Sequence, residues 1–224
     1  EALANGKLPN EVVMEIYKAK NLYDTSTTTS SGWFIYNETK KGDILCTTGD
    51  LGAAYVGLQV LEREKQVFLS NPDMQPELDK YQYIVQRQLK PSARMDVIHE
   101  LADLGIVPTS MIDISDGLAS EILHLQQNSN LGFRIYEDKL PISDESRQAA
   151  YKFGLDPTVC ALNGGEDYEL IFTLKQEDHD KITLNEDISV IGYVVEINEG
   201  SKLLTKGGNT FDITAQGWTA FKEA

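Results

Sequence analysis

Two aspartates on either side of one serine are the residues of this sequence best suited to chemistry. In the stretch MIDISDGLASEILHL, Asp113 and Asp116 lie where a short apolar run gives way to a helical pattern. Two carboxylates that converge there would suit Mg²⁺, a hard cation that binds one or two carboxylates together with phosphate oxygens. The pattern is therefore compatible with a divalent metal site beside a phosphorylated ligand.

A purely structural role competes with the metal site. Ser115 and Asp116 stand at the start of the expected helix, and both residue types commonly cap helix N-termini. Asp113 is harder to explain as a cap, because strand alternation turns it and Ser115 away from the face that carries Ile112 and Ile114. Spacing alone leaves both interpretations open, a helix cap or a metal ligand.

A second pair of acids follows a glycine turn in ALNGGEDYELIFTL. Gly164 and Gly165 allow the backbone to turn tightly, and Glu166 and Asp167 then stand at the mouth of an apolar strand. Acids in that place would accept hydrogen bonds from a cationic or amine-bearing ligand. The alternative is that both are solvated turn residues, a common role for acids in turns.

Other candidate residues carry weaker signals. Trp218 in AQGWTAF would stack on a flat heterocycle, or it is a core or edge tryptophan. The stretch TTGDLGAA at 47–54 resembles a phosphate-cradling turn, but it lacks the P-loop pattern, and helix packing explains its glycines equally well. His99, His124 and His179 have no metal-ligand spacing, so we expect no catalytic role for them.

Composition narrows the class of protein. The 224 residues suit one large domain or two small ones, and the net charge of -15 argues against nucleic acid or an anionic membrane as the main partner. Phosphate ligands stay open, because metal ions mediate between carboxylates and phosphates. Cys46 and Cys160 lie in apolar stretches, which favours buried thiols in a reducing compartment. With no apolar run of membrane-spanning length and no signal-like start, we expect a cytoplasmic protein.

Strands and helices alternate along the chain, which is typical of an α+β fold, an α/β sandwich of helices on a sheet. The expected strands are 32–37, 44–48, 107–115, 133–142, 168–174 and 187–197, with a hairpin over 203–213. The expected helices are 11–23, 49–65, one that ends at Pro91, 95–105, 116–132, 145–154 and 175–182. The apolar stripes of two of them are Ala54, Leu58 and Leu61, and Leu118, Ile122 and Leu125.

Between residues 24 and 43 the chain carries too few elements to complete a sheet. A polar block at 24–32, which reads as a loop, is followed by one six-residue strand and a turn. We therefore expect a partial chain, without its beginning.

Five stretches, in one order, resemble the thiamine-monophosphate kinases, a family of the PurM-like, AIR synthase-related ATP-binding superfamily. They are GDILCTTGDLGAAYVGLQ, MIDISDGLASEILHL, FRIYEDKLPI, ALNGGEDYELIFT and the terminal GW, and they cover residues 41 to 221. The combination of D-x-S-D-G-L with G-G-E-D-Y-E-L is the specific part. The resemblance implies a two-domain PurM-like architecture. Residues 1–40 would be part of an N-terminal, ATP-binding domain that pairs across a homodimer, and 41–224 the C-terminal domain.

The resemblance also implies roles for individual residues. Asp113 and Asp116 match metal-binding acids, and Ser115 matches a nucleotide-contacting serine. Glu166 matches the acid that meets the substrate, and Trp218 the aromatic ring near its heterocycle. The implied reaction is phosphorylation of thiamine monophosphate to thiamine diphosphate, with ATP as co-substrate and Mg²⁺ as cofactor. No side chain would act as a general base, because the acceptor phosphate is already anionic.

The sequence departs from this family near its start. The N-terminal metal-binding acids and the G-G-D-T loop have no counterpart, and Leu22-Tyr23 stands where glycines are expected. Asn37 and Glu38 occupy the neighbourhood of an expected nucleotide-binding arginine. Alternatives are another PurM-like enzyme, similar to selenophosphate synthetase or to hydrogenase-maturation proteins, and a non-catalytic thiamine-phosphate binding protein. A selenophosphate synthetase would need a reactive N-terminal nucleophile such as cysteine, and none is visible.

Overall fold

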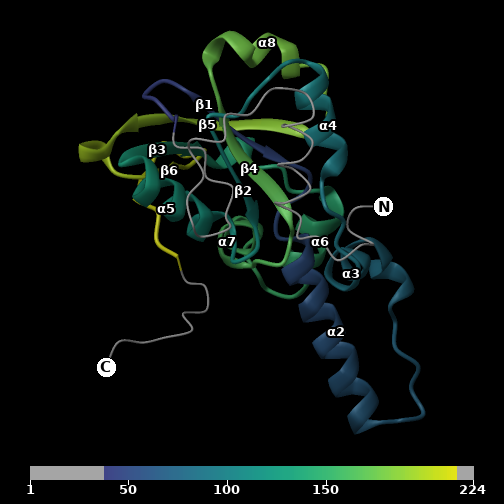
Figure 1. The fold of residues 1–224 in the computed structure, drawn as a ribbon. Coiled ribbons are helices and arrows are strands. Elements are labelled where there is room, and N and C mark those ends of the chain that lie inside the picture. Colours follow the sequence, from purple (N-terminus) through teal and green to yellow (C-terminus); the bar gives the residue numbers. More distant parts are fainter. Residues whose placement is uncertain (1–37, 216–224) are drawn as a thin grey trace.

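A mixed β-sheet forms the centre of the structure, a computed structural model that describes residues 38–215 (Figure 1). Over these residues the sheet has the strand order β2-β4-β1-β5-β3-β6-β7. Neighbouring strands are antiparallel except β3 and β6, which are parallel. The strands are β1 (Ile44–Thr48), β2 (Ser110–Ile114), β3 (Leu131–Tyr136), β4 (Glu169–Leu174), β5 (Ile188–Glu196), β6 (Lys202–Leu204) and β7 (Thr210–Asp212).

Helices cover both faces of this sheet, which confirms the predicted α+β sandwich (Figure 1). The helices are α2 (Ala53–Ser70), α3 (Gln82–Leu89), α4 (Met95–Asp103), α5 (Leu118–Ser129), α6 (Asp144–Lys152), α7 (Pro157–Asn163) and α8 (His179–Ile182). Apolar side chains of α5 and α7 fill one core with the sheet, and those of α4 and α8 fill the core on the other face.

Strand β1 shows why both faces must be covered. Leu45 belongs to the core under α5, whereas the next residue, Cys46, belongs to the core under α4. Successive side chains of a strand point to opposite faces, so a strand that is apolar at consecutive positions needs a helix layer on each side. Cys46 and Cys160 are free and buried, as predicted, and burial raises the pKa of the Cys46 thiol to about 12.

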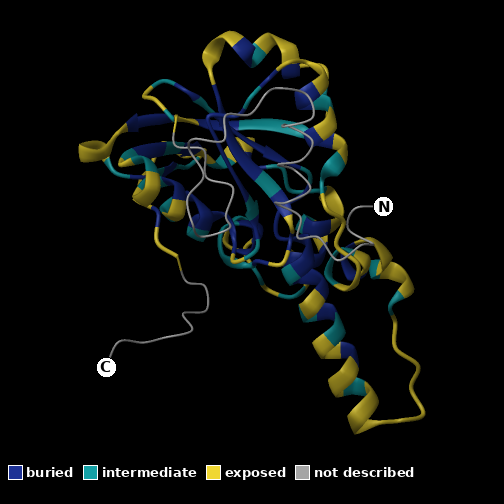
Figure 2. Ribbon diagram, in the orientation of Figure 1, coloured by how far each residue is buried: buried dark blue, intermediate teal, exposed yellow. Residues whose placement is uncertain are grey.

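Helices α2 and α3 form an arm. Their apolar side chains pack with those of α6 in a third core, separate from the two cores on the sheet. The far half of α2 and the loop at 71–77 project from the body and are mostly exposed (Figure 2). The predicted stripe of Ala54, Leu58 and Leu61 is therefore wrong in part, since Leu58 is 36% exposed while Val56 and Val60 are buried. The helix turns its small and β-branched side toward α3 and α6 instead of toward the sheet.

Several predicted elements have different limits in the structure. The strand expected at 133–142 begins at Leu131, because Asn130, at φ 55°, ends α5 and Leu131 already pairs with Glu196. The helix expected at 175–182 is a 3-10 turn followed by the single turn of α8. Helix α7 was not predicted, although Asp156 caps it and a proline opens it.

Other predictions are confirmed by the structure or concern residues that it does not describe. Leu118, Ile122 and Leu125 are buried as expected, and the terminal hairpin forms between β6 and β7. The predictions for the helix at 11–23, the loop at 24–32, the strand at 32–37 and Trp218 fall outside the described residues. Over residues 38–215, no helix combines the length and the apolar character needed to cross a bilayer.

Candidate functional site

The end of strand β2 carries the two aspartates, and the helix-cap interpretation is wrong for both Ser115 and Asp116. Helix α5 begins at Leu118, and its N-cap residue is Gly117, at φ 109°. Because this glycine separates Asp116 from the helix, no side-chain cap forms there among the described residues. The carboxylate of Asp116 is exposed, and Asp113 is half-buried.

The glycine turn of the second motif packs directly on this strand end. The N–H of Glu166 donates to the carbonyl of Ser115 at 2.7 Å, and the N–H of Tyr168 donates to the carbonyl of Ile114 at 2.9 Å. Gly165 is at φ 70°, and a Cβ atom there would lie 2.7 Å from the Ser115 carbonyl oxygen. The fold thus brings two motifs together that are far apart in the sequence.

Two residues of this turn adopt a conformation that is costly for side chains other than glycine. Glu166 is at φ 62° and Tyr168 at φ 51°, both in the left-handed region. Such a conformation costs on the order of 1–3 kcal/mol per residue, and it persists only where the surroundings hold it. The turn places the exposed residue Glu166 beside the end of β2, where Asp116 is also exposed.

Tyr168 is a site residue that the sequence analysis missed. Burial is the main cause that raises the pKa of its phenol, followed by a hydrogen bond with Glu166 and by the negative charges of Glu166, Asp113 and Asp116. The phenol therefore lies among the carboxylates of both motifs. Its place directly after the acids in G-G-E-D-Y was the available signal.

A buried glutamate, Glu121, supports the aspartates from the first turn of α5. Its carboxylate is 2% exposed and accepts the N–H of Asp116 at 3.0 Å. Burial raises the pKa of Glu121 to about 7, the Asp116 N–H opposes this, and repulsion by Asp116 and Asp113 adds to it. Burial, with repulsion by Asp116, likewise raises the pKa of Asp113. The end of β2 therefore concentrates negative charge, and no salt bridge within residues 38–215 offsets the charge of Asp113 or Asp116.

The aspartates suit Mg²⁺ as a pair rather than as a complete metal cage. Within residues 38–215, no three His, Cys, Asp or Glu side chains form a metal-binding group, and neither Asp113 nor Asp116 makes a salt bridge there. Two unpaired carboxylates that repel each other fit a cation that needs few protein ligands and completes its shell with water and phosphate oxygens.

The two acids of the glycine turn have different roles. Glu166 is exposed, but Asp167 is 0% exposed and accepts the N–H groups of Gly52 at 2.7 Å and Ala54 at 3.2 Å. Asp167 is thus neither a solvated turn acid nor a ligand acceptor. It caps helix α2, so these two N–H groups of the stretch at 47–54 are not available for a phosphate.

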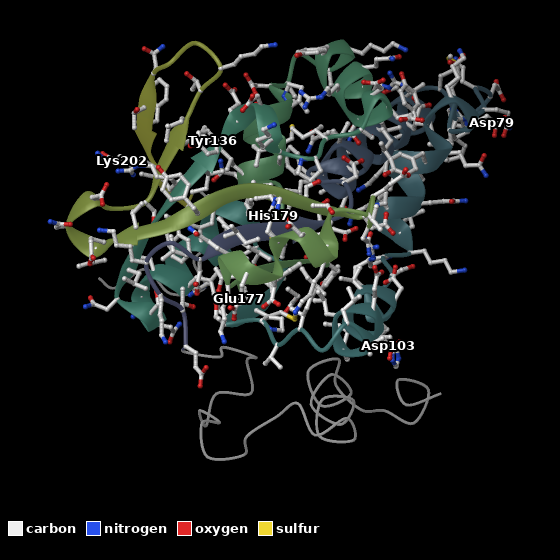
Figure 3. The ribbon with its side chains drawn as sticks, turned by 90° about the horizontal axis from the view of Figure 1, so that it is seen from above. Asp79, Asp103, Tyr136, Glu177, His179 and Lys202 are labelled. Carbon is white, nitrogen blue, oxygen red and sulfur yellow. The ribbon has the colours of Figure 1, made fainter. Side chains whose placement is uncertain are left out.

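The three histidines do not belong to the candidate site at the end of β2. His99 and His124 are exposed. His179 is on α8, close to Glu177 and on the outside of the molecule, where it contacts Asp180 at 3.1 Å (Figure 3). Within the described part of the chain, none of the three belongs to a metal-binding group.

Known proteins resemble this chain over most of its length. The family described as "AIR synthase related protein, C-terminal domain" matches residues 40–202. The thiamine-monophosphate kinase of Aquifex aeolicus (strain VF5) is 33% identical over 175 residues, which cover 76% of this chain and 52% of that protein. The thiamine-monophosphate kinase of Pyrococcus horikoshii is 33% identical over 157 residues, 70% of this chain and 44% of that protein.

Solved structures of two kinds of protein also resemble this chain. AaThiL complexed with AMPPCP and TMP has a TM-score of 0.65 at 31% identity, over 83% of this chain and 53% of that one. A hydrogenase maturation protein, HypE, in complex with ATP has a TM-score of 0.59 at 17% identity, over 81% of this chain and 53% of that one, which shows a shared fold alone.

The chain spans about half the length of the curated relatives that it matches. The predicted resemblance to thiamine-monophosphate kinases is confirmed by these relatives. Because the family match covers most of the sequence, from residue 40 to residue 202, the chain belongs to the AIR synthase related proteins and contains their C-terminal domain.

Proposed function

We propose that this chain is part of an enzyme that transfers the terminal phosphoryl group of ATP to thiamine monophosphate, which yields thiamine diphosphate and ADP. The observation that carries the proposal is the junction of two motifs, since the Glu166 turn is hydrogen-bonded to the strand end that bears Asp113 and Asp116. The relatives named thiamine-monophosphate kinase support the choice of reaction.

Each site residue has a defined task in this proposal. The carboxylates of Asp113 and Asp116 would hold Mg²⁺, and Ser115 would contact the nucleotide. Glu166 and Trp218 receive the thiamine part of the acceptor, the acid by polar contact and the indole by stacking on the heterocycle. When bound, Mg²⁺ neutralises negative charge on the phosphate oxygens.

The chemistry requires positioning more than proton transfer. An anionic phosphate oxygen of thiamine monophosphate attacks the γ-phosphorus of ATP in line with the leaving group. A new P–O bond forms, the bond from the γ-phosphorus to the β–γ bridging oxygen breaks, and its electron pair leaves with ADP. The attacking oxygen carries no proton to remove, so the rate gain comes from orientation and charge stabilisation.

The setting of the enzyme is part of the same proposal. Residues 1–40 contribute to an N-terminal, ATP-binding domain that pairs in a homodimer, and 41–224 form the C-terminal domain. The protein works in the cytoplasm, with neither nucleic acid nor membrane as a partner. These points rest on the resemblance to the kinases and on the net charge of -15.

Substitution of Asp113 tests the metal role. Asp113→Asn removes one of the two carboxylates, so we expect Mg²⁺-dependent binding of ATP to weaken at least about tenfold in isothermal titration calorimetry. The melting temperature should not fall, because the change relieves the repulsion by Asp116. Asp79→Asn removes an exposed charge on the arm, far from β2, and serves as the control (Figure 3).

Two outcomes would contradict the proposal. If Asp113→Asn and Asp79→Asn bind Mg²⁺ and ATP equally well, the acids at the end of β2 do not hold the metal. If the full-length protein binds thiamine monophosphate but makes no thiamine diphosphate with ATP and Mg²⁺ present, the binding-protein alternative is correct.

A further inference from the structure

One side chain of the arm reaches the turn that carries Glu166. Arg87 lies on α3, and its side chain is 17% exposed. Its Nη2 donates to the carbonyl of Asp50 at 3.2 Å, to the carbonyl of Asp167 at 3.2 Å and to Oε1 of Glu169 at 2.8 Å. A single guanidinium nitrogen thus joins the start of α2, the glycine turn and the start of β4.

The carboxylate of Glu169 anchors this guanidinium. Glu169 is 1% exposed and forms ion pairs with Arg87 at 2.8 Å and with Arg94 at 2.9 Å. Its carboxylate also accepts a hydrogen bond from the hydroxyl of Thr48 on β1. A buried carboxylate between two arginines satisfies the charges that its burial would otherwise leave unpaired. The ion pair with Glu169 therefore fixes the position of the Arg87 side chain beside the turn.

The carbonyl that Arg87 holds lies between the two strained residues. Asp167 stands between Glu166 and Tyr168, both with positive φ angles. The N–H groups of Glu166 and Tyr168 are held by β2, whereas the carbonyl of Asp167 is held by Arg87. Without that donor, a carbonyl close to a buried side chain would lose a charge-assisted hydrogen bond, and the turn would lose the support that keeps its left-handed residues in place.

We propose that Arg87 is a positioning residue: from the arm, it fixes the backbone of the turn so that Glu166 faces the thiamine substrate. The part of this inference that concerns the substrate rests on the proposed function, whereas the part that concerns the turn does not. Arg87 touches no reacting group. It acts on binding through the conformation of Glu166.

Arg94 provides a matched control. It pairs with the same Glu169 carboxylate from the opposite oxygen, at 2.9 Å, and is buried to a similar degree, with 11% of its side chain exposed. It also pairs with Asp96 and Asp187, but it makes no hydrogen bond to the turn at 164–168. Arg87→Gln and Arg94→Gln each remove one ion pair of Glu169, and only the first removes the donor to the Asp167 carbonyl.

The first experiment measures backbone amide hydrogen exchange by NMR, without any ligand. In Arg87→Gln, we expect the N–H groups of Glu166 and Tyr168 to exchange at least about tenfold faster than in Arg94→Gln, relative to their global unfolding measured in urea. Should Arg87→Gln fail to fold, Arg87→Lys, which keeps one donor but not the planar fork, replaces it and should give a smaller increase. Equal exchange in the variants of both arginines would overturn the positioning role.

The second experiment is a double-substitution cycle read by calorimetry with thiamine monophosphate. Arg87→Gln should weaken binding of thiamine monophosphate about tenfold, leave binding of ATP unchanged, and have no further effect in a Glu166→Gln background. Additive losses in the double variant would mean that Arg87 does not act through Glu166. If Glu166→Gln alone leaves binding unchanged, the substrate role of Glu166 in the proposed function fails, and the exchange experiment still decides the role of Arg87 in the turn.

Discussion

At the scale of single residues, the adjacent acids Glu166 and Asp167 show how one step along the chain changes a role. Both follow the same glycine pair, and both read as acids at the mouth of a strand. Glu166 is exposed beside the end of β2, while Asp167 is completely buried and caps helix α2. Burial raises the pKa of Asp167 to about 7, although the N–H groups of Gly52 and Ala54 oppose the shift.

The raised pKa of Asp167 predicts a pH-dependent stability. In the unfolded chain the carboxyl ionises near its ordinary pKa of 3.8, but in the folded chain it stays protonated up to about pH 7. The stabilisation is therefore full below about pH 4 and is lost as the pH rises to about 7. Relative to Asp167→Asn, the wild-type protein should lose up to about 1.4 kcal/mol for each pH unit between pH 5 and 7.

Urea unfolding of both proteins at pH 5, 6 and 7 measures this loss. Asp156→Asn is the matched control, because Asp156 also accepts two backbone N–H groups at a helix start, those of Thr158 and Val159, but is exposed. This variant controls for the removal of an acid that accepts backbone N–H groups at a helix start. A constant difference between wild type and Asp167→Asn across this range would mean that the carboxyl is already ionised in the folded state at pH 5.

At the scale of elements, close contacts between backbone segments hold the two motifs of the site together. Helix α7 ends against the start of α5, where a Cβ atom at Gly117 would lie 2.8 Å from the carbonyl oxygen of Leu162. The turn that follows α7 then lies on the end of β2. The site therefore depends on a helix that contributes no functional side chain of its own, and on glycines that let three backbones approach one another.

Gly165→Ala tests this dependence. Its Cβ atom would meet the Ser115 carbonyl oxygen at 2.7 Å, and its φ of 70° is unfavourable for alanine. We expect a loss of about 2–4 kcal/mol in the free energy of unfolding, because a clash adds to the left-handed cost of about 1–2 kcal/mol.

Gly105→Ala separates the two contributions to that loss. Gly105 has a similar φ of 67°, but no atom lies within 4 Å of its added Cβ. It should therefore show only the conformational cost, about 1–2 kcal/mol in a denaturant titration. If both variants lose the same free energy, the contact between the turn and β2 is softer than the structure indicates.

At the scale of the whole molecule, the net charge of -15 must be reconciled with the two phosphate-bearing ligands of the proposed function. The acids at the end of β2 concentrate negative charge where phosphates would bind, so direct binding would be repulsive. A divalent cation would neutralise the charges of Asp113 and Asp116 and offer coordination positions to phosphate oxygens. A cation held by these acids would therefore reconcile the negative charge of the chain with phosphate ligands.

Removal of the metal should abolish nucleotide binding. With EDTA present, calorimetry should detect no binding of ATP, and excess Mg²⁺ should restore it. Higher concentrations of NaCl without Mg²⁺ should not restore it, because monovalent screening weakens repulsion but supplies no coordination. Strong ATP binding in EDTA would show that side chains, rather than a cation, neutralise the phosphates.

The sequence by itself determined the α+β class, most element positions and the membership of Asp113, Asp116 and Glu166 in two motifs. These follow from local chemistry, namely hydrophobic periodicity, glycine turns and residue types at fixed spacing. The alternation of Ile112 and Ile114 with Asp113, for example, required only the period of a strand.

The tertiary structure decided which of the open interpretations hold. Whether Asp116 caps a helix depended on where α5 begins, and whether Asp167 faces a ligand depended on the N–H groups of α2 beside it. Arg87, Glu121 and Tyr168 joined the site through contacts between distant segments. Burial and long-range hydrogen bonds are properties of the packed molecule, and no local pattern in the sequence encodes them.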